Sequence, residues 1–386
     1  MASLLLAFIY IAFISLGLPD SLLGSGWPAM YVELGAPVAA QSFITMIITM
    51  STIVSSLATA PLMRKLATGK LVAGSVALTA AAILGFSAST NIVMLCVIAV
   101  PYGLGAGAID SALNNYVAIH YGERHMSWLH CFWGIGTSVS PMIMGWALTG
   151  PLGWHGGYLT VGIIQCVITA LMVFSLPLWK KNGDDSELSE EEASELTYAK
   201  ALKLRGAKTA IAAFVCYAAF EYVCGLWTSS YLTLARGTTE SQAASMVSFF
   251  YIGITLGRLA SGFIAPKLGS KNMIRYGQIV AAAGLAVLIL GQGELVLSTA
   301  LILIGLGCAP IYPCIISLTP VRFGEAASQT MVSLQMALYY VGTTVAPIIA
   351  SLMVGAGGAA FIPAFLAAIL VAMFAFSEAT NRSLSD

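Results

Sequence analysis

The sequence has very little charge. Charged residues make up 9% of its 386 residues, whereas a water-soluble domain carries about 25%. Hydrophobic residues account for 58%. These proportions exclude a soluble domain and predict an all-α polytopic membrane protein, with the lipid bilayer as its solvent. The 17 basic and 17 acidic residues balance. No basic stripe is interleaved with aromatics, so we expect no nucleic-acid partner.

Sequence motifs of soluble enzymes are absent as well. We find no nucleophile elbow, Walker loop or HExxH motif. The Gly-x-Gly-x-Gly run at 103–107 lies inside an apolar stretch and is therefore no nucleotide loop. His120, His125 and His130 recur every five residues, which does not place them on one helical face. We therefore expect no catalytic residue, no metal site and no cofactor.

The cysteines form no Cys-x-x-Cys pair, so neither a disulfide framework nor a zinc ribbon is expected. Each lies within an apolar run, where a cysteine behaves as a small core residue. The seven are Cys96, Cys131, Cys166, Cys216, Cys224, Cys308 and Cys314.

Apolar runs dominate the rest of the chain. A helix needs about 20 residues to cross the hydrocarbon core, and breaks at charged, proline-rich or glycine-rich points predict twelve spans. The first run lacks a basic n-region and exceeds an h-region in length, so we interpret it as a span rather than a cleaved signal. The expected spans are about 3–32, 41–62, 71–89, 92–120, 126–149, 156–179, 208–234, 241–265, 273–291, 295–321, 327–354 and 358–377.

A polar segment at residues 180–207 separates two sets of six spans. It predicts a linker between an N-terminal six-helix bundle (1–179) and a C-terminal six-helix bundle (208–386). Within it, Ser189 and Glu192 have the spacing of a capping box, which predicts a short surface helix.

Lysine and arginine in the short loops predict the orientation. With the N-terminus in the cytoplasm, only Arg236 falls on the opposite side. We therefore expect both termini and the linker in the cytoplasm, and the protein in the cell (inner or plasma) membrane. The loop bases on the cytoplasmic side are Arg64, Lys65, Lys70, Arg124, Lys267, Lys271, Arg275 and Arg322.

The two halves also show an internal repeat, at an offset near 200 residues. An even number of spans in each half gives both the same topology, related by an axis along the membrane normal. Transporters built this way hold their substrate between the halves. The matched pairs are Asp20 with Glu221, Trp27 with Trp227, Tyr31 with Tyr231, Gly103 with Gly305, Gly105 with Gly307, and Pro141 with Pro347.

Four charged residues lie inside predicted spans, namely Asp20, Asp110, Glu221 and Arg258. A charge in the bilayer interior costs several kcal/mol, so each is a functional candidate. Carboxyl groups in a low dielectric exchange protons nearer neutral pH, as proton-coupled transport requires. Packing against a neighbouring helix is the alternative for each acid, and Glu221 could simply pair with Arg258. Pro19 precedes Asp20 and removes a backbone donor, so we expect a break or tilt there.

Asp110 and Asn114 share a helix face, one turn apart. The turn at Tyr121 and Gly122 sets His130 at a similar depth. A histidine beside an aspartate could relay protons or donate to a substrate hydroxyl, and a histidine bonded to a backbone carbonyl is the open alternative.

Aromatic and amide side chains complete the candidate substrate site. An indole face can stack on the apolar side of a sugar, which makes Trp27, Trp133 and Trp227 candidates. Span 11 adds hydrogen-bonding groups at Gln335, Tyr339 and Tyr340. Trp146, Trp154 and Trp179 lie near span ends, where tryptophan is typical of the membrane interface.

Several of these runs resemble the fucose–proton symporter group of the major facilitator superfamily, and the superfamily resemblance covers essentially the whole chain. The resemblance implies twelve helices in two pseudo-symmetric bundles. It also implies sugar-binding and proton-coupling roles for Asp20 and Asp110. The matching features are Asp20 with Gly24, Trp27 and Pro28; Asp110 with Asn114; the run His130-Cys131-Phe132-Trp133-Gly134-Ile135-Gly136; and Gly257-Arg258 with Gly262.

The chain departs from the group at three places. His130 stands where the group has a polar amide. The superfamily's loop signature after span 2 lacks its glycine and aspartate at residues 63–66, and its second copy at 262–271 has Pro266 in place of the acid.

The function these patterns favour is proton-coupled uptake of a neutral, hexose-like sugar by alternating access. Asp110, Asp20 and Glu221 are the candidate proton-coupling acids. The protein's partners would be the sugar, the proton and the bilayer, and we expect a monomer.

The alternatives are efflux of an amphipathic compound, a gradient-independent sugar uniporter, an intramembrane enzyme or a transport-dead sensor. The absence of catalytic motifs and of an output domain argues against the last two. The substrate-binding candidates are Asp20, Trp27, Asn114, His130, Trp133, Trp227, Gln335 and Tyr340.

Overall fold

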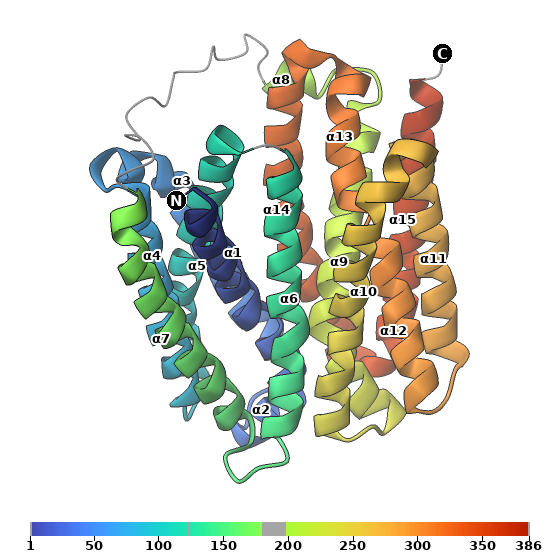
Figure 1. Ribbon diagram of the computed structural model, residues 1–386. Helices are drawn as coiled ribbons and strands as arrows, with labels where there is room; N and C mark the ends of the chain where they lie inside the picture. Colours follow the sequence, from blue (N-terminus) through green and yellow to red (C-terminus); the bar gives the residue numbers. More distant parts are fainter. Residues whose placement is uncertain (1, 122, 180–197, 385–386) are drawn as a thin grey trace. The chain divides into compact units, whose positions relative to one another are not determined.

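The protein is described by a computed structural model that covers residues 2–121, 123–179 and 198–384 (Figure 1). These residues form helices, and no strand occurs among them. The chain divides into two compact units. Unit 1 comprises Met1–Ser189 and Leu232–Ser248, and unit 2 comprises Glu190–Tyr231 and Phe249–Asp386. Residues 232–248, which the sequence pattern assigns to the C-terminal half, thus group with unit 1.

Unit 1 is a bundle in which α1 packs on α6, α3 and α4 pack on α5, and α4 also packs on α7. These helices run from blue to green in Figure 1. They are α1 (Ala2–Asp20), α2 (Leu22–Glu33), α3 (Ala40–Lys65), α4 (Thr68–Ser87), α5 (Ile92–His120), α6 (Glu123–Ala147) and α7 (Gly153–Trp179).

Unit 2 contains most of the remaining helices, and α9 and α10 each contribute one end to unit 1. Within it, α11 packs on α12, α13 and α15, and α13 packs on α14. The helices are α8 (Tyr198–Ala201), α9 (Ala207–Arg236), α10 (Glu240–Leu268), α11 (Ser270–Leu290), α12 (Glu294–Cys308), α13 (Ile311–Phe323), α14 (Glu325–Gly357), the short 3₁₀ helix η1 (Ala359–Phe361) and α15 (Ile362–Ser383).

Eleven helical segments in the described part of the chain are long and apolar enough to cross a bilayer. The predicted span at 126–149 corresponds to α6, which has 25 residues but carries polar residues along its length, such as His130, Thr137 and Ser140. The expectation of an all-α polytopic membrane protein is confirmed.

Span 1 breaks at Ser21, directly after Asp20, as Pro19 predicts. The break is held by α6, because the Ser21 hydroxyl lies 2.9 Å from the carbonyl of Thr137 and 2.7 Å from the hydroxyl of Ser140. Asp20 therefore ends one helix directly before a residue whose side chain is hydrogen-bonded to α6.

Span 10 also breaks, which the sequence pattern did not predict. It divides into α12 and α13 around Ala309 and Pro310, although together they form one crossing segment, Glu294–Phe323. Pro310 has no backbone N–H to continue the helical ladder, and the new helix starts when Cys314 donates to the Pro310 carbonyl at 3.1 Å.

The internal repeat is visible in the helix contacts of the two units. In unit 1, Gly103 meets the backbone of α3 at Ile48, and Gly105 meets α4 at Ser75. In unit 2, the corresponding glycines make the corresponding contacts: Gly305 meets α10 at Phe250, and Gly307 meets α11 at Gly277 and Ala281. Since no side chain fits at these points, the glycines allow three helices to pack closely in each half.

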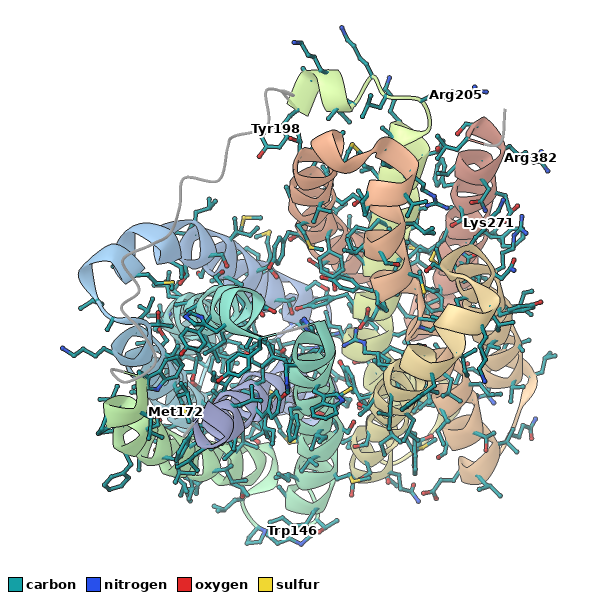
Figure 2. All side chains as sticks on the ribbon, turned by 45° about the horizontal axis from the view of Figure 1, so that its top comes forward. Trp146, Met172, Tyr198, Arg205, Lys271 and Arg382 are labelled. Atoms are coloured by element: carbon teal, nitrogen blue, oxygen red, sulfur yellow. The ribbon has the colours of Figure 1, made fainter. Side chains whose placement is uncertain are left out.

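Two other expectations need correction. Trp154 and Trp179 are buried at 1% and 7% exposure, so they pack against other helices and do not face outward as residues of an aromatic belt do. Trp146, labelled in Figure 2, is 70% exposed, as an interfacial residue would be. Cys224, Cys308 and Cys314 are buried as expected, but Cys166 is exposed.

The last part of the predicted linker packs on unit 2, where Ala201, Leu202 and Leu204 contact Ile211 and Met331. The capping box predicted at Ser189 and Glu192 lies outside the described residues.

Candidate functional site

The carboxylate of Asp20 is the best-defined polar group within the spans of unit 1. One oxygen accepts a hydrogen bond of 2.9 Å from the Tyr102 hydroxyl, and the other accepts one of 2.8 Å from the Trp133 indole nitrogen. The residue is nevertheless exposed. Each carboxylate oxygen has further lone pairs after these two bonds, so Asp20 is fixed in position and still able to accept from a ligand.

A close crossing of α1 and α6 brings Asp20 and Trp133 together. A side chain at Gly17 would collide with the backbone of Trp133 and Thr137, and one at Gly136 would collide with the backbone of Ile14, Gly17 and Leu18. Only glycine permits this approach. Because Gly17 lies one turn before Asp20, the glycine contact determines where the carboxylate meets the indole.

Asp110 lies on α5 and is half-buried. Asn114, one turn later, donates to the Asp110 carboxylate at 2.8 Å and to its backbone carbonyl at 3.0 Å. The predicted shared face is therefore present. Asp20 is close enough for its charge to act on Asp110, so the two acids form one electrostatic site in unit 1.

His130 lies on α6, and its ring meets the edge of Phe13 from α1 at a centroid distance of 5.8 Å. Its neighbour Phe132 stacks on Tyr10 at 4.6 Å, and the Tyr10 hydroxyl lies 2.9 Å from Nδ1 of His125. The α1–α6 contact that carries Asp20 and Trp133 thus continues toward the start of α6 as an aromatic layer.

Trp27 and Trp227 are both fully buried, each with 0% exposure. The Trp27 indole donates to the Val38 carbonyl at 2.7 Å. Both tryptophans are core residues in this structure, and neither exposes an indole face. Their predicted role in substrate binding stays a prediction.

Glu221 and Arg258 form a buried pair in unit 2. A guanidinium nitrogen of Arg258 lies 3.4 Å from one Glu221 oxygen, with side-chain exposures of 15% and 10%. In the part of the chain described, the second Glu221 oxygen and the Trp227 indole nitrogen are buried without a hydrogen-bond partner. The predicted alternative for Glu221, a pair with Arg258, is therefore present.

The two span-11 candidates lie on α14. Gln335 is buried, and its side-chain oxygen accepts a hydrogen bond of 2.9 Å from the Thr319 hydroxyl of α13. This bond joins α13 to α14. Tyr340 is half-buried and packs edge-on against Tyr339, which also contacts Phe214 and Tyr312. This aromatic cluster lies near Glu221 and Arg258, since the charges of both act on Tyr339.

Tyr102 is the functional candidate that the sequence pattern missed. It bonds to Asp20 across 82 positions of the chain, and the available signal was a hydroxyl-bearing side chain directly before the glycine run of the Asp110 helix. Among the described residues, no group of three or more histidine, cysteine, aspartate or glutamate side chains is arranged to hold a metal ion.

Comparison with known proteins identifies the fold. The sequence model of the Major Facilitator Superfamily matches residues 9–220 and 209–384. The chain belongs to this superfamily. It is therefore a multi-pass membrane transporter.

Solved structures of two major facilitators, each a point variant, share the fold. The nucleoside transporter NupG aligns with a TM-score of 0.74 and 14% identity, over 98% of this chain and 99% of that one. The Escherichia coli fucose:proton symporter FucP aligns with a TM-score of 0.64 and 17% identity, over 97% of both chains. The resemblance to the fucose–proton symporter group is confirmed at the level of fold.

Curated relatives match over part of their length. An uncharacterized major facilitator transporter of Yersinia pestis is 24% identical over 247 residues, 63% of this chain and 59% of that protein. The cis,cis-muconate transport protein of Acinetobacter baylyi is 25% identical over 201 residues, 48% of this chain and 47% of that protein. The matched regions thus span about half to three fifths of these relatives.

Proposed function

We propose that this transporter takes up a neutral, hexose-like sugar together with a proton by alternating access, across the cell membrane and with both termini in the cytoplasm. The observation that carries the proposal is the Asp20 carboxylate, which is fixed by Tyr102 and Trp133 yet exposed. A fixed carboxylate beside an indole suits a sugar, because hydroxyls donate to the oxygens and the apolar ring face packs on the indole.

Asp110 is the proposed coupling acid. Protonation makes it neutral, so that the transporter can close without burying an uncompensated charge. Since Asp20 acts electrostatically on Asp110, a proton on one acid and a sugar on the other influence each other's binding reciprocally. Asn114 donates to Asp110 and is the proposed link to a sugar hydroxyl. His130 and Tyr340 remain proposed substrate contacts.

A second candidate is an organic acid, favoured by Arg258. This guanidinium lies within a span and holds Glu221 at 3.4 Å, longer than the usual charge-assisted hydrogen bond. A substrate carboxylate could replace Glu221 on Arg258 once Glu221 takes up a proton. The muconate transport protein among the relatives supports this class.

One experiment distinguishes the two candidates. The full chain is reconstituted in proteoliposomes, and uptake of radiolabelled hexoses and of cis,cis-muconate is measured with and without an inward proton gradient. Gradient-dependent hexose uptake that Asp20→Asn abolishes supports the sugar proposal. Muconate uptake that depends on Arg258 and not on Asp20 supports the second candidate and contradicts the first.

A further inference from the structure

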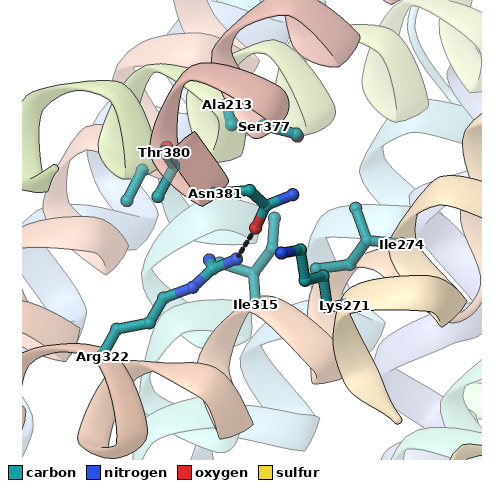
Figure 3. A pocket seen from close by; sticks show the side chains of 9 residues that line it. Ala213, Lys271, Ile274, Ile315, Arg322, Ser377, Thr380 and Asn381 are labelled. Atoms are coloured by element: carbon teal, nitrogen blue, oxygen red, sulfur yellow. Dashed lines mark hydrogen bonds between the residues drawn. The ribbon is translucent and has the colours of Figure 1, made fainter. Parts of the chain in front are cut away.

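A small cavity with several polar side chains in its lining lies at one end of unit 2. It is lined by residues of α9, α11, α13 and α15, among them Lys271, Arg322, Ser377 and Asn381 (Figure 3). Its volume of about 10 Å³ admits one water-sized group. It is therefore too small for a transported sugar, and its lining is rich in hydrogen-bond donors.

Positive charge around this cavity exceeds negative charge among the described residues. Arg275 binds both oxygens of Glu378, and this is the carboxylate whose charge acts on Lys271. Arg322 donates a hydrogen bond of 2.8 Å to the side-chain oxygen of Asn381, which is a neutral group. Among the described side chains here, Arg275, Lys271 and Arg322 thus face one carboxylate, that of Glu378, so the described lining carries a surplus of positive charge.

The hydrogen-bond inventory points the same way. Ser377 is 7% exposed, and its hydroxyl oxygen accepts a hydrogen bond of 3.0 Å from Gln278. Within the described part of the chain, its own hydroxyl hydrogen is still available to donate. Asn381 already uses its amide nitrogen on Glu378 and its oxygen on Arg322. In Figure 3 the ammonium group of Lys271 and the guanidinium of Arg322 both lie below Asn381. A group that enters between these side chains meets donors, and an anionic oxygen satisfies them best.

The cavity lies where candidate membrane spans begin or end. α11 begins at Ser270, α13 ends at Phe323 and α15 ends at Ser383, and each of these residues bounds a segment long and apolar enough to cross a bilayer. The ends of membrane-spanning helices lie near the lipid headgroups, so a phosphate group can reach the cavity. Lys271 and Arg382 mark the same end of unit 2 in Figure 2. The distribution of loop bases assigns this end to the cytoplasm, where basic pockets between membrane helices bind anionic headgroups.

We propose that this cavity binds a phosphate group, with one anionic oxygen inserted between Lys271 and Arg322 and hydrogen-bonded by the Ser377 hydroxyl. The source is the headgroup of an anionic phospholipid or a free phosphate ion, which offer the same chemistry. Occupation ties the ends of α11, α13 and α15 to one another and stabilises unit 2. The site is independent of which substrate is transported.

The test measures the apparent melting temperature of the purified, delipidated full chain, with no transport assay. One arm titrates phosphatidylglycerol against a phosphatidylcholine background, and the other titrates inorganic phosphate against sodium chloride at matched ionic strength. We expect the ligand to raise the melting temperature by about 2–4 °C. Arg322→Gln and Lys271→Gln should each weaken the apparent affinity about fivefold, the usual contribution of one basic residue.

Arg382→Gln is the matched control, because Arg382 lies in the last turn of α15 but does not line the cavity. It should keep the full response. Ser377→Ala removes a donor without changing charge, so it tests the site even if Arg322→Gln fails to fold. A response to phosphatidylglycerol alone identifies the headgroup, and a response to inorganic phosphate alone identifies the free ion. Equal responses of Arg382→Gln and of the three cavity variants in both arms would overturn the proposal.

Discussion

The indole nitrogen of Trp133 donates a hydrogen bond of 2.8 Å to the carboxylate of Asp20, across the point where α1 and α6 cross most closely. The Tyr102 hydroxyl holds the other oxygen of the same carboxylate. Two neutral donors thus position an acid without neutralising it. This arrangement preserves the negative charge for a substrate or a proton.

Replacing Trp133 by phenylalanine tests that relationship. The substitution keeps an aromatic ring but removes the donor, and a hydrogen bond to a charged group contributes about 1.5–3 kcal/mol. We expect substrate affinity to fall about tenfold or more, as measured by equilibrium binding to the purified protein. Tyr102→Phe should act in the same direction. Trp146→Phe is the control, since Trp146 is 70% exposed and lies away from the site. Unchanged affinity in both Trp133→Phe and Tyr102→Phe would show that Asp20 needs no such positioning.

Asp110→Asn separates binding from coupling. Asparagine mimics the protonated acid at nearly the same volume, so the variant should retain substrate exchange but lose the extra uptake produced by acidifying the outside of proteoliposomes. Asp20→Asn should mainly lower substrate affinity. If Asp110→Asn still accumulates substrate in response to the gradient, the coupling role passes to Asp20 or Glu221, or the protein is a uniporter.

Gly17→Ala and Gly136→Ala should destabilise unit 1. In each case the added methyl group meets main-chain atoms of the partner helix, which cannot move aside as a flexible side chain could. We expect a loss of about 1–3 kcal/mol, seen as a lower melting temperature, together with weaker substrate binding because Asp20 moves off Trp133. Gly74→Ala provides the contrast, since its methyl group would meet nothing within 4 Å. A loss of stability in Gly74→Ala as large as that of the other two would disprove the steric explanation.

Breaking the Glu221–Arg258 pair should cost more stability than removing it altogether. Arg258→Gln leaves a buried, uncompensated carboxylate and is expected to destabilise by about 3–5 kcal/mol. The double variant Glu221→Gln, Arg258→Gln leaves no buried charge at either position and should recover part of that loss. Thermal unfolding in one detergent measures both. A double variant no more stable than Arg258→Gln would argue that Glu221 is already neutral in the folded protein.

Cysteine labelling tests the predicted orientation. Lys203 and Leu152 are both exposed and lie on loops that the sequence assigns to opposite sides. In a background without native cysteines, Lys203→Cys should react with an impermeant reagent only after the cells are permeabilised, and Leu152→Cys should react in intact cells. The reverse pattern would invert the topology and place the proposed phosphate cavity on the outer face.

The sequence was sufficient for the helical class and for the break after Asp20, but proline alone does not show where a span breaks. Pro101, Pro141 and Pro347 lie inside continuous helices, whereas the chain divides at Pro310. The difference depends on which neighbouring groups satisfy the freed backbone atoms, as Gln165 does at the first break, where its side-chain amide donates to the Ser15 carbonyl four residues before Pro19. Local sequence does not contain that information.

The candidate site was also predictable only in part, because some of its residues give a local signal in the sequence and others do not. Charge inside an apolar run identified Asp20 and Asp110, because that signal is local. Trp27 and Trp227 also gave a clear repeat signal, but repetition reports equivalent positions and does not distinguish a core tryptophan from one that faces a substrate. Tyr102 gave neither a charge nor a repeat signal, only a hydroxyl-bearing side chain before the glycine run, because its importance arises from a contact across 82 positions.

The matched glycines of α5 and α12 have a consequence for how tolerant the chain is to mutation. Gly103 and Gly305 each meet the backbone of one neighbouring helix, and Gly105 and Gly307 each meet that of another. A saturation scan of the whole gene should therefore show the same short pattern of intolerance twice, once in each half. If the two halves arose by duplication, their acidic and aromatic residues could change independently. These four positions would have to remain glycine in both halves.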